Sequence, residues 1–330
     1  MGKKMQNLKT TRVLIGNGGH QQTRETIEKT FDTVVASPEQ VADLGLDERS
    51  QIVAIGALFI PVRADLINLL PNLEIISSFG VGYDQIDAKY AAEKGVVVTH
   101  TPNVLDDEVA DTTIALLLNT VRELYHAEKH LREGRWDKEG NYPLTSLSMR
   151  GRSIGIYGLG RIGQTIAKRL SGFDVPIHYH SRNEVEGVNF PYHSTLKGLA
   201  EAVDTLIAIV PGTPQTQHAI NAEVLTALGK RGVLINVGRG PVVDEQALIK
   251  ALQDKTIAAA GLDVFEHEPA VPQELIDLPN TCLFPHVASA SEDTRMAMGN
   301  LVVDNLVEWF SNGTAITPTP ESKQLNNRKP

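Results

Sequence analysis

Three charged or titratable side chains stand just past the ends of short apolar segments in the second half of the chain. They are Arg239 in INVGRGPVVDE, Glu268 in GLDVFEHEP and His286 in LFPHVAS. Reduction of a keto acid needs a cation that holds the carboxylate and polarises the carbonyl, and an acid that protonates the forming alkoxide. Arginine and histidine suit these tasks, and a carboxylate bonded to the imidazole would orient it. We therefore take these three residues as candidate catalytic residues.

Spacing alone is weak support for such a site. The chain has ten histidines, and a histidine at a strand end is more often structural than catalytic. His267 is a nearer sequence neighbour of Glu268 than His286 is, and we interpret it as a surface turn residue. The elements that carry these residues must therefore decide whether they meet.

A glycine motif upstream predicts a nucleotide site. Gly158, Gly160 and Gly163 form G-x-G-x-x-G between the apolar segment SIGIY and the helical pattern RIGQTIAKRLSGF, which is the context that this otherwise weak motif requires. Gly158 would allow a tight turn, Gly160 a close approach to a pyrophosphate, and Gly163 close packing of helix on strand. The phosphates would lie at the helix N-terminus, where unpaired N–H groups favour negative charge. The alternative is that the glycines serve only a tight turn.

The segment IHYHSRN, residues 177–183, indicates which nucleotide is bound. NAD-binding proteins often carry an acid at the end of this strand, which bonds both ribose hydroxyls and repels the extra phosphate of NADP. Here Ser181 removes that repulsion, Arg182 supplies a planar cation suited to phosphate, and Asn183 adds a donor. We interpret the segment as a site for the 2′-phosphate and expect NADPH to be preferred over NADH. The alternative is a polar loop whose arginine is merely solvated.

The wider pattern supplies elements that could position these residues. Short apolar runs alternate with amphipathic segments, as is typical of parallel strands buried on both faces and joined by helices. The first series predicts strands at 12–16, 33–36, 51–57, 73–79 and 95–101 with a helix at 64–70; the second predicts strands at 153–158, 177–180, 205–210, 232–237, 258–264 and 281–286. We therefore expect an α/β protein with two doubly wound parallel sheets.

Two segments lie outside these series. Residues 106–135 carry apolar groups at helical spacing and predict one long helix with Asp106 or Asp107 as its N-cap, followed by a loop that contains Trp136. This helix either packs on the second sheet or forms a projecting arm. The helical pattern at 292–310 could return to the first domain, and the tail TPTPESKQLNNRKP is expected to be frayed.

Composition narrows the class of protein. The 330 residues suffice for two domains, and 42% hydrophobic with 22% charged residues is the composition of a soluble globular chain rather than a disordered or fibrous one. A net charge of −9 and a pI near 5.6 argue against a nucleic-acid or membrane-surface partner. No apolar run predicts a membrane span or a signal peptide. The single cysteine, Cys282, excludes an internal disulfide framework and fits a cytoplasmic protein.

The motifs INVGRGPVVDEQALIKAL, AAGLDVFEHEP and LFPHVAS, in that order after GLGRIG, resemble those of the D-isomer-specific 2-hydroxyacid dehydrogenase family. Within the family, the segment SSFGVGYDQID, the GRW turn and the pair Ser181-Arg182 are most similar to NADPH-dependent glyoxylate/hydroxypyruvate reductases and hydroxyphenylpyruvate reductases. The resemblance implies a Rossmann cofactor domain at 102–286 and a flavodoxin-like substrate domain at 1–101 plus 287–330.

The resemblance also implies individual roles. Arg239 would bind the substrate carboxylate and carbonyl, His286 would donate the proton, and Glu268 would be its partner. Further substrate contacts would come from Leu58, Val81, Gly82 and Trp136. Cofactor contacts would come from Gly158, Gly160, Arg161, Ile162, Gly163, Ser181, Arg182, Asn183, Val210, Pro211, Val237, Gly238, Asp263, His286 and Ala288, with Asp263 at the nicotinamide carboxamide. No metal ion is expected.

The family also implies a homodimer formed through an arm, here at 105–147, with Trp136 reaching toward the partner's active site. A cleft between the domains would close on the bound substrate and exclude water. The expected activity is reduction of a small 2-keto acid such as glyoxylate or hydroxypyruvate. The loop 58–61, Leu-Phe-Ile-Pro, is apolar and leaves room for a larger keto acid, so a hydroxyphenylpyruvate or 2-ketogluconate reductase is an alternative. A nucleotide-sensing, corepressor-like binding protein is an alternative of another class.

Overall fold

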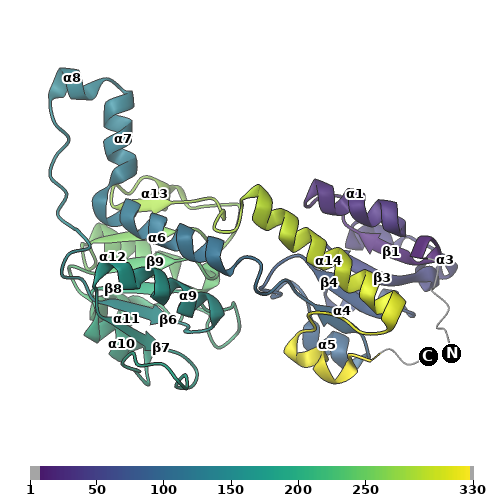
Figure 1. Ribbon diagram of the computed structural model, residues 1–330. Coiled ribbons are helices and arrows are strands. Elements are labelled where there is room, and N and C mark those ends of the chain that lie inside the picture. Colours follow the sequence, from purple (N-terminus) through teal and green to yellow (C-terminus); the bar gives the residue numbers. More distant parts are fainter. Residues whose placement is uncertain (1–7, 328–330) are drawn as a thin grey trace. The chain divides into compact units, whose positions relative to one another are not determined.

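The structure, a computed structural model, describes residues 8–327 and divides the chain into two compact units (Figure 1). Unit 1 comprises Met1–Leu105 and Ser291–Pro330, and unit 2 comprises Asp106–Ala290. The chain therefore passes from unit 1 to unit 2 and back again. Both crossing points lie a few residues after the boundaries expected from the sequence.

Unit 1 is built on a five-stranded sheet in which every neighbouring pair is parallel. Its strands are β1 Arg12–Ile15, β2 Asp32–Val35, β3 Ile52–Ala57, β4 Ile75–Ser78 and β5 Val97–Thr99, in the spatial order β2-β1-β3-β4-β5. This order is the flavodoxin-like one. The strands β1, β3, β4 and β5 are almost wholly buried, as a continuous apolar pattern predicts, whereas the edge strand β2 is half-buried.

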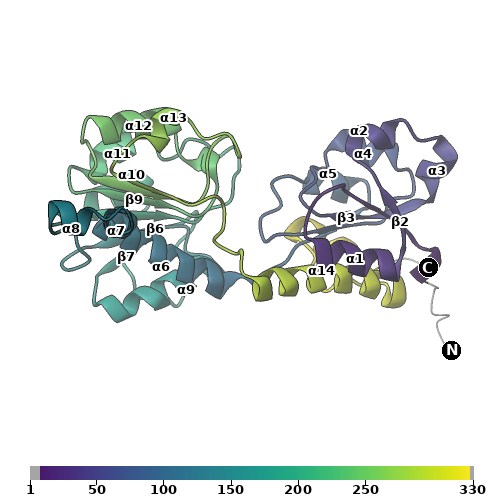
Figure 2. The ribbon, with the colours of Figure 1, turned by 90° about the horizontal axis from the view of Figure 1, so that it is seen from above.

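Helices cover both faces of this sheet. The helical segments of unit 1 are η1 Leu8–Thr10, α1 Gln21–Thr30, α2 Pro38–Ala42, α3 Leu46–Gln51, α4 Ala64–Leu69, α5 Ala88–Glu93, α14 Glu292–Asn312 and η4 Pro320–Leu325. Figure 2 shows α1 and α14 on one face and α2 to α5 on the other. Two side-chain bonds hold α14 to β4 and to the residue just before it: Ser77 Oγ donates to Val302 O at 3.0 Å, and Trp309 Nε1 donates to Glu74 Oε2 at 3.1 Å. The predicted return of the C-terminal helix to the first sheet is confirmed.

The prediction of a frayed tail is wrong for residues 317–327. Thr319 N donates to Val98 O at 2.8 Å, and Val98 N donates to the hydroxyl of Ser322 at 2.9 Å. The tail therefore satisfies main-chain groups of the edge strand β5, and Thr319 and Ser322 are buried. Its proline-rich composition did not reveal this because the partner strand is distant in sequence. Residues 328–330 of the predicted tail lie outside the described part of the chain.

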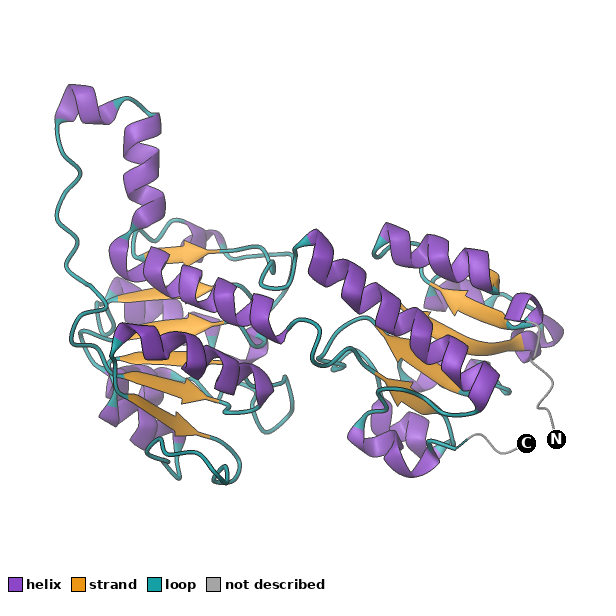
Figure 3. Ribbon diagram, viewed as in Figure 1, coloured by secondary structure: helices purple, strands orange, loops and turns teal. Residues whose placement is uncertain are grey.

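Unit 2 contains a six-stranded sheet, again parallel throughout (Figure 3). The strands are β6 Ile154–Tyr157, β7 Ile177–His180, β8 Thr205–Ala208, β9 Val233–Asn236, β10 Ala259–Leu262 and β11 Thr281–Leu283, in the order β11-β10-β9-β8-β6-β7. The order reverses at β6, so the crevice between the carboxyl ends of β6 and β8 is the place where such sheets bind nucleotides. All eleven strands overlap the segments predicted from the sequence.

Two layers of helices bury this second sheet. Its helical segments are α6 Asp106–Arg122, α7 Leu124–Arg132, α8 Arg135–Glu139, α9 Arg161–Leu170, η2 Ser171–Phe173, α10 Leu196–Ala202, α11 Ala222–Leu228, η3 Gly240–Val242, α12 Glu245–Gln253 and α13 Gln273–Ile276. One core cluster packs α6 and α9 on one face, and another packs α10, α11 and α12 on the opposite face. The doubly wound architecture predicted for both sheets is confirmed.

The prediction of one long helix over 106–135 is wrong. The helix begins at Asp106, so neither Asp106 nor Asp107 is its N-cap, and it ends at Arg122 because Glu123 adopts a left-handed conformation with φ of 51°. The carboxylate of Glu123 accepts a hydrogen bond from Tyr142 Oη at 2.8 Å. Because Glu123 is neither glycine nor proline, its residue type does not indicate a helix end. The feature that accompanies the break is its hydrogen bond to Tyr142, which is distant in the chain. The helices α7 and α8 then project away from the rest of unit 2 (Figure 1). Across residues 8–327, no helix is both long and apolar enough to span a membrane.

Candidate active site and cofactor site

The glycine motif forms the turn between β6 and α9 in unit 2. Gly158 has φ of 103°, in the left-handed region that favours glycine, and a Cβ there would lie 2.7 Å from Ile209 O. A Cβ on Gly163 would collide with the carbonyl oxygen of Gly158. Gly160, the N-cap of α9, has open space where a side chain would stand. The turn therefore has room for a ligand at the end of α9, where the first N–H groups of a helix lack partners within the helix.

Ser181 links this turn to the end of β7. Its Oγ accepts a hydrogen bond from Leu159 N at 2.8 Å, and Gly158 N donates to His180 O at 2.8 Å. A serine thus braces the glycine turn without introducing negative charge at the position where an acid would oppose a phosphate. The side chains of Arg182 and Asn183 are exposed beside it. These residues fit a dinucleotide that carries an additional phosphate on its ribose.

The predicted cofactor residues after β8 and β9 adjoin the same turn. Val210 and Pro211 follow β8, and a Cβ on Gly158 would lie 2.7 Å from a side-chain atom of Val210. Val237 and Gly238 follow β9, and a Cβ on Gly238 would lie 2.7 Å from Val210 O. The structure therefore brings these segments together with the glycine turn. Arg161, the first residue of α9, forms an ion pair with Asp106 at 3.4 Å.

Glu268 and His286 form a hydrogen-bonded pair. His286 Nδ1 donates to Glu268 Oε2 at 2.7 Å, and the second carboxylate oxygen accepts from Phe265 N at 3.0 Å. Burial opposes ionisation of Glu268, but the bonds from His286 and Phe265, with the charge of Arg239, outweigh it and hold the pKa of Glu268 below its ordinary value. The carboxylate therefore stays ionised and fixes one imidazole nitrogen, which leaves Nε2 for another partner.

Asp263 anchors the turn that carries His286. Its two carboxylate oxygens accept from Val287 N at 2.8 Å and Ala288 N at 3.0 Å, and its carbonyl accepts from His286 N at 2.8 Å. His286 is held there with φ of 54°. The Asp263 side chain is fully buried, and burial raises its pKa even though the two N–H donors act in the opposite direction. The contact of Asp263 with a nicotinamide stays a prediction.

Arg239 follows β9 and is half-buried. Its Nη1 donates to Gly238 O at 2.7 Å, while Asn236 Nδ2 donates to Arg239 O at 3.0 Å. A Cβ on Gly240, the residue after Arg239, would collide with Phe265 O, so the loop of Arg239 packs directly against the loop that carries Glu268. Three residues separated along the chain are thus gathered at the carboxyl ends of parallel strands of one sheet, where open α/β sheets bind ligands.

Sequence reasoning missed a buried carboxylate that bonds the main chain of the loop carrying Glu268. Glu245, the first residue of α12, is only 4% exposed and accepts from Glu266 N at 2.7 Å. The carboxylate of Glu266 in turn bonds His218 Nε2 at 2.6 Å. Burial raises the pKa of Glu245, although the hydrogen bond from Glu266 N acts in the opposite direction. Glu245 lies in the first turn of α12, where an acid is ordinarily exposed, so its residue type did not indicate a buried anchor.

The predicted substrate-binding residues of unit 1 lie at the carboxyl ends of its strands. Leu58 follows β3, and the whole residue is fully buried, so none of its atoms is open to a substrate in this structure. The next residue, Phe59, is 63% exposed. Val81 and Gly82 follow β4, and His100 Nδ1 donates to Val81 O at 2.9 Å, which leaves the N–H side of this turn for other partners.

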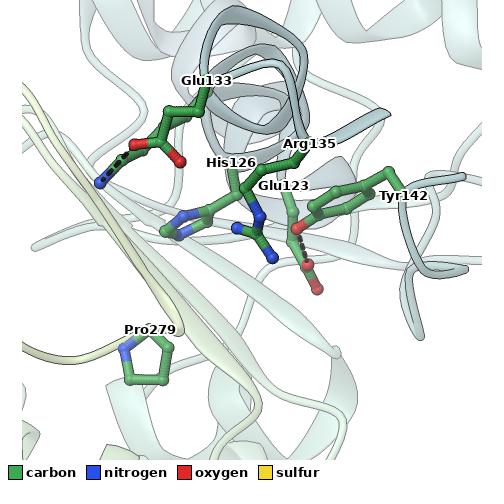
Figure 4. A pocket seen from close by; sticks show the side chains of 7 residues that line it. Glu123, His126, Glu133, Arg135, Tyr142 and Pro279 are labelled. Carbon is green, nitrogen blue, oxygen red and sulfur yellow. Dashed lines mark hydrogen bonds and ion pairs between the residues drawn. The ribbon is translucent and has the colours of Figure 1, made fainter. Parts of the chain in front are cut away.

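The arm of unit 2 carries Trp136 on α8, where the indole is 57% exposed and donates to Asn141 Oδ1 at 3.0 Å. A hollow of about 290 Å³ lies along the arm (Figure 4). It is lined by Glu123, His126, Lys129, Glu133, Arg135, Tyr142 and Pro279, none of which is a predicted site residue. Burial and the Glu123 carboxylate raise the pKa of Tyr142 to about 12.

Within residues 8–327, no three His, Cys, Asp or Glu side chains gather as metal ligands would.

Comparison with known proteins agrees with this geometry. Residues 114–288 match the family model described as D-isomer specific 2-hydroxyacid dehydrogenase, NAD binding domain, and the chain belongs to this family. The chain is 46% identical to glyoxylate/hydroxypyruvate reductase A of Arabidopsis thaliana, over 88% of this chain and 93% of the relative. It is also 46% identical to a hydroxyphenylpyruvate reductase of Plectranthus scutellarioides, over 85% of this chain and 89% of the relative.

A solved structure is similar over nearly the whole chain. The crystal structure of an NADPH-dependent glyoxylate/hydroxypyruvate reductase from Sinorhizobium meliloti, in complex with NADP and malonate, superimposes with a TM-score of 0.91. It shares 53% identity and covers 97% of this chain and 99% of its own.

Proposed function

We propose that the protein is an NADPH-dependent reductase of small 2-keto acids, with glyoxylate and hydroxypyruvate as its substrates. The observation that carries the proposal is the Glu268–His286 pair at 2.7 Å, held beside Arg239 in the unit that also contains the glycine turn. This combination provides a proton donor, a cation and a nucleotide site in one unit. A binding protein that only senses nucleotides would have no need of the first two.

Each proposed catalytic residue has one task. Arg239 binds the substrate carboxylate and polarises the keto oxygen, and His286 Nε2 gives a proton to that oxygen as the alcohol forms. Glu268 keeps the imidazole in the tautomer and orientation that expose Nε2. The proposed cofactor supplies the hydride that the carbonyl carbon accepts. The overall reaction consumes a keto acid, NADPH and one proton, and it yields the 2-hydroxy acid and NADP.

The cofactor preference is proposed from the end of β7. Ser181 bears no charge and Arg182 is an exposed cation, so the extra phosphate meets attraction rather than repulsion. The similar reductase of Sinorhizobium meliloti, described as NADPH-dependent, supports this choice. Val81 and Gly82 in unit 1 are proposed as additional groups for the substrate carboxylate, through their N–H groups.

A homodimer formed through the arm, in the cytoplasm, is also proposed. Five large apolar side chains of the arm are exposed: Leu124, Tyr125, Leu131, Trp136 and Leu144. Such a surface on a projecting element is typical of a protein interface.

The first experiment is a set of initial rates with NADPH and NADH across glyoxylate, hydroxypyruvate, hydroxyphenylpyruvate and 2-ketogluconate. We expect NADPH to exceed NADH by at least about tenfold in kcat/KM, because the charge-assisted bonds of Arg182 form only with the phosphate. Faster turnover with NADH would refute the cofactor assignment. Failure to oxidise either nucleotide with any of these acids would refute the enzyme itself.

One observation favours a second substrate class. The ring of Phe59 is exposed and packs on the buried ring of Phe79, with ring centres 5.2 Å apart, so Phe59 alone presents an aromatic surface in unit 1. A hydroxyphenylpyruvate side chain could stack on such a surface. Higher kcat/KM for hydroxyphenylpyruvate than for hydroxypyruvate would establish this alternative.

A further inference from the structure

The loop that carries Arg182 leaves β7 after His180 and returns to pair with Tyr179 of the same strand. Tyr179 N donates to Pro191 O at 3.0 Å, and Tyr179 O accepts from His193 N at 2.9 Å. Tyr179 and Tyr192 form an isolated parallel bridge at the edge of the sheet, and their rings lie 5.4 Å apart. The chain therefore leaves β7 after His180 and returns to the main chain of Tyr179.

The side chain of Tyr179 makes a third attachment to the same loop. Its ring is fully buried in the core cluster beneath α9, and its hydroxyl accepts from Val185 N at 3.0 Å. Val185 directly follows the exposed residues 182–184. At the other end of this short turn, Ser181 Oγ accepts from Leu159 N at 2.8 Å. The turn of residues 181–184 is thus held at both ends by a side-chain oxygen.

The hydroxyl adds nothing to the packing of the core, because a phenylalanine ring would fill the same space. What it adds is an acceptor for a main-chain N–H beside the turn. An exposed arginine loses many rotamers when it binds an anion, so a turn with a fixed main chain reduces the entropy that binding must overcome. We propose that Tyr179 is a positioning residue for cofactor choice, which holds the turn so that Arg182 meets the 2′-phosphate. This inference rests on the proposed NADPH preference.

The test is direct binding of NADPH and of NADH to the full-length protein, measured by fluorescence titration. In the variant Tyr179→Phe we expect the Kd for NADPH to rise about fivefold, the ratio given by the net strength of one hydrogen bond. The Kd for NADH should be unchanged, because NADH has no phosphate for Arg182 to bind. The variant Tyr157→Phe is the matched control, since Tyr157 lies opposite His180 on the neighbouring strand but packs in the other core cluster.

A double-mutant cycle separates positioning from general loosening. In the Arg182→Ala background the hydroxyl no longer has a guanidinium to position, so adding Tyr179→Phe should leave the Kd for NADPH unchanged. Hydrogen exchange of the Val185 amide in the unaltered protein is an independent measurement, and we expect that amide to be protected.

Three results would overturn the inference. They are equal weakening of NADPH and NADH by Tyr179→Phe, additive effects in the cycle, and exchange of the Val185 amide at the rate of a free amide. If Arg182→Ala itself leaves NADPH binding unchanged, the proposed cofactor preference fails together with the inference. If Arg182→Ala weakens NADPH binding but Tyr179→Phe does not, only the inference fails.

Discussion

At the scale of single residues, successive hydrogen bonds hold the side chains of the candidate site in place. Asp263 holds the main chain around His286, Glu268 holds its ring, and Phe265 N holds Glu268. The two acids differ in environment. The buried carboxylate of Asp263 has a raised pKa, whereas the carboxylate that meets the imidazole has a lowered one. Asp263 and Glu268 are both acidic residues in the sequence, but their environments in the fold give them different tasks.

Replacement of His286 by Asn tests the proton donor with little disturbance of the main chain. Asparagine tolerates the left-handed conformation that His286 adopts, with φ of 54°. We expect kcat for keto acid reduction to fall at least about a hundredfold, because the proton donor is lost. NADPH binding, measured by fluorescence titration, should remain. Near-normal turnover would remove His286 from its proposed role.

The lowered pKa of Glu268 should also appear as a pH dependence of stability. Its folded pKa lies below the ordinary value of 4.5, so its contribution is complete above about pH 4.5 and is lost as the pH falls through the folded pKa. We expect Glu268→Gln to melt about 2 °C below the unaltered protein at neutral pH, a small gap because the pair is partly exposed. This gap should close as the pH falls below 4.5. A gap of the same size at neutral and at strongly acid pH would contradict the assignment.

At the scale of elements, the turn between β6 and α9 combines two different uses of glycine. Gly163 is needed for packing, since a Cβ there would collide with Gly158 O, whereas Gly160 has open space. We expect Gly163→Ala to destabilise the fold by about 2 kcal/mol. Gly160→Ala should leave the melting temperature unchanged and weaken NADPH binding, because its methyl group would stand where the pyrophosphate approaches.

Thermal denaturation and fluorescence titration of both variants check this pair of expectations. Gly172→Ala is the control, because Gly172 also has nothing within 4 Å of an added Cβ but lies at the far end of α9. If Gly160→Ala bound NADPH as tightly as that control does, the pyrophosphate would not lie at this turn.

At the scale of the whole molecule, the arm exposes large apolar side chains that its own chain does not cover. Leu131 and Tyr125 on α7 are 55% and 59% exposed. Soluble monomers rarely expose several large apolar side chains together in one patch. We expect the double variant Tyr125→Glu, Leu131→Glu to convert the proposed dimer into a monomer in sedimentation experiments, with unchanged circular dichroism.

Leu46→Glu provides the matched control for the arm. Leu46 is 64% exposed on α3 of unit 1, outside the arm. This variant should remain dimeric. A dimer that survives both arm substitutions would show that the arm is not the interface.

The sequence by itself determined the periodic features of this protein. Buried parallel strands are continuous apolar runs and helices repeat their apolar residues every three or four positions, so all eleven strands and the two sheets could be predicted. Because parallel sheets present ligands at the carboxyl ends of their strands, Arg239, Glu268 and His286 could be placed near one another, and the family motifs supplied their roles.

Only the tertiary structure decided features that depend on one partner distant in the chain. The left-handed break at Glu123, the pairing of Thr319 and Ser322 with Val98, and the buried contact of Glu245 with Glu266 each involve such a bond. A hydrogen bond between residues far apart leaves no periodic trace, because it imposes no spacing on the residues around it. Local pattern therefore predicted the framework, and the fold decided which polar groups within it meet.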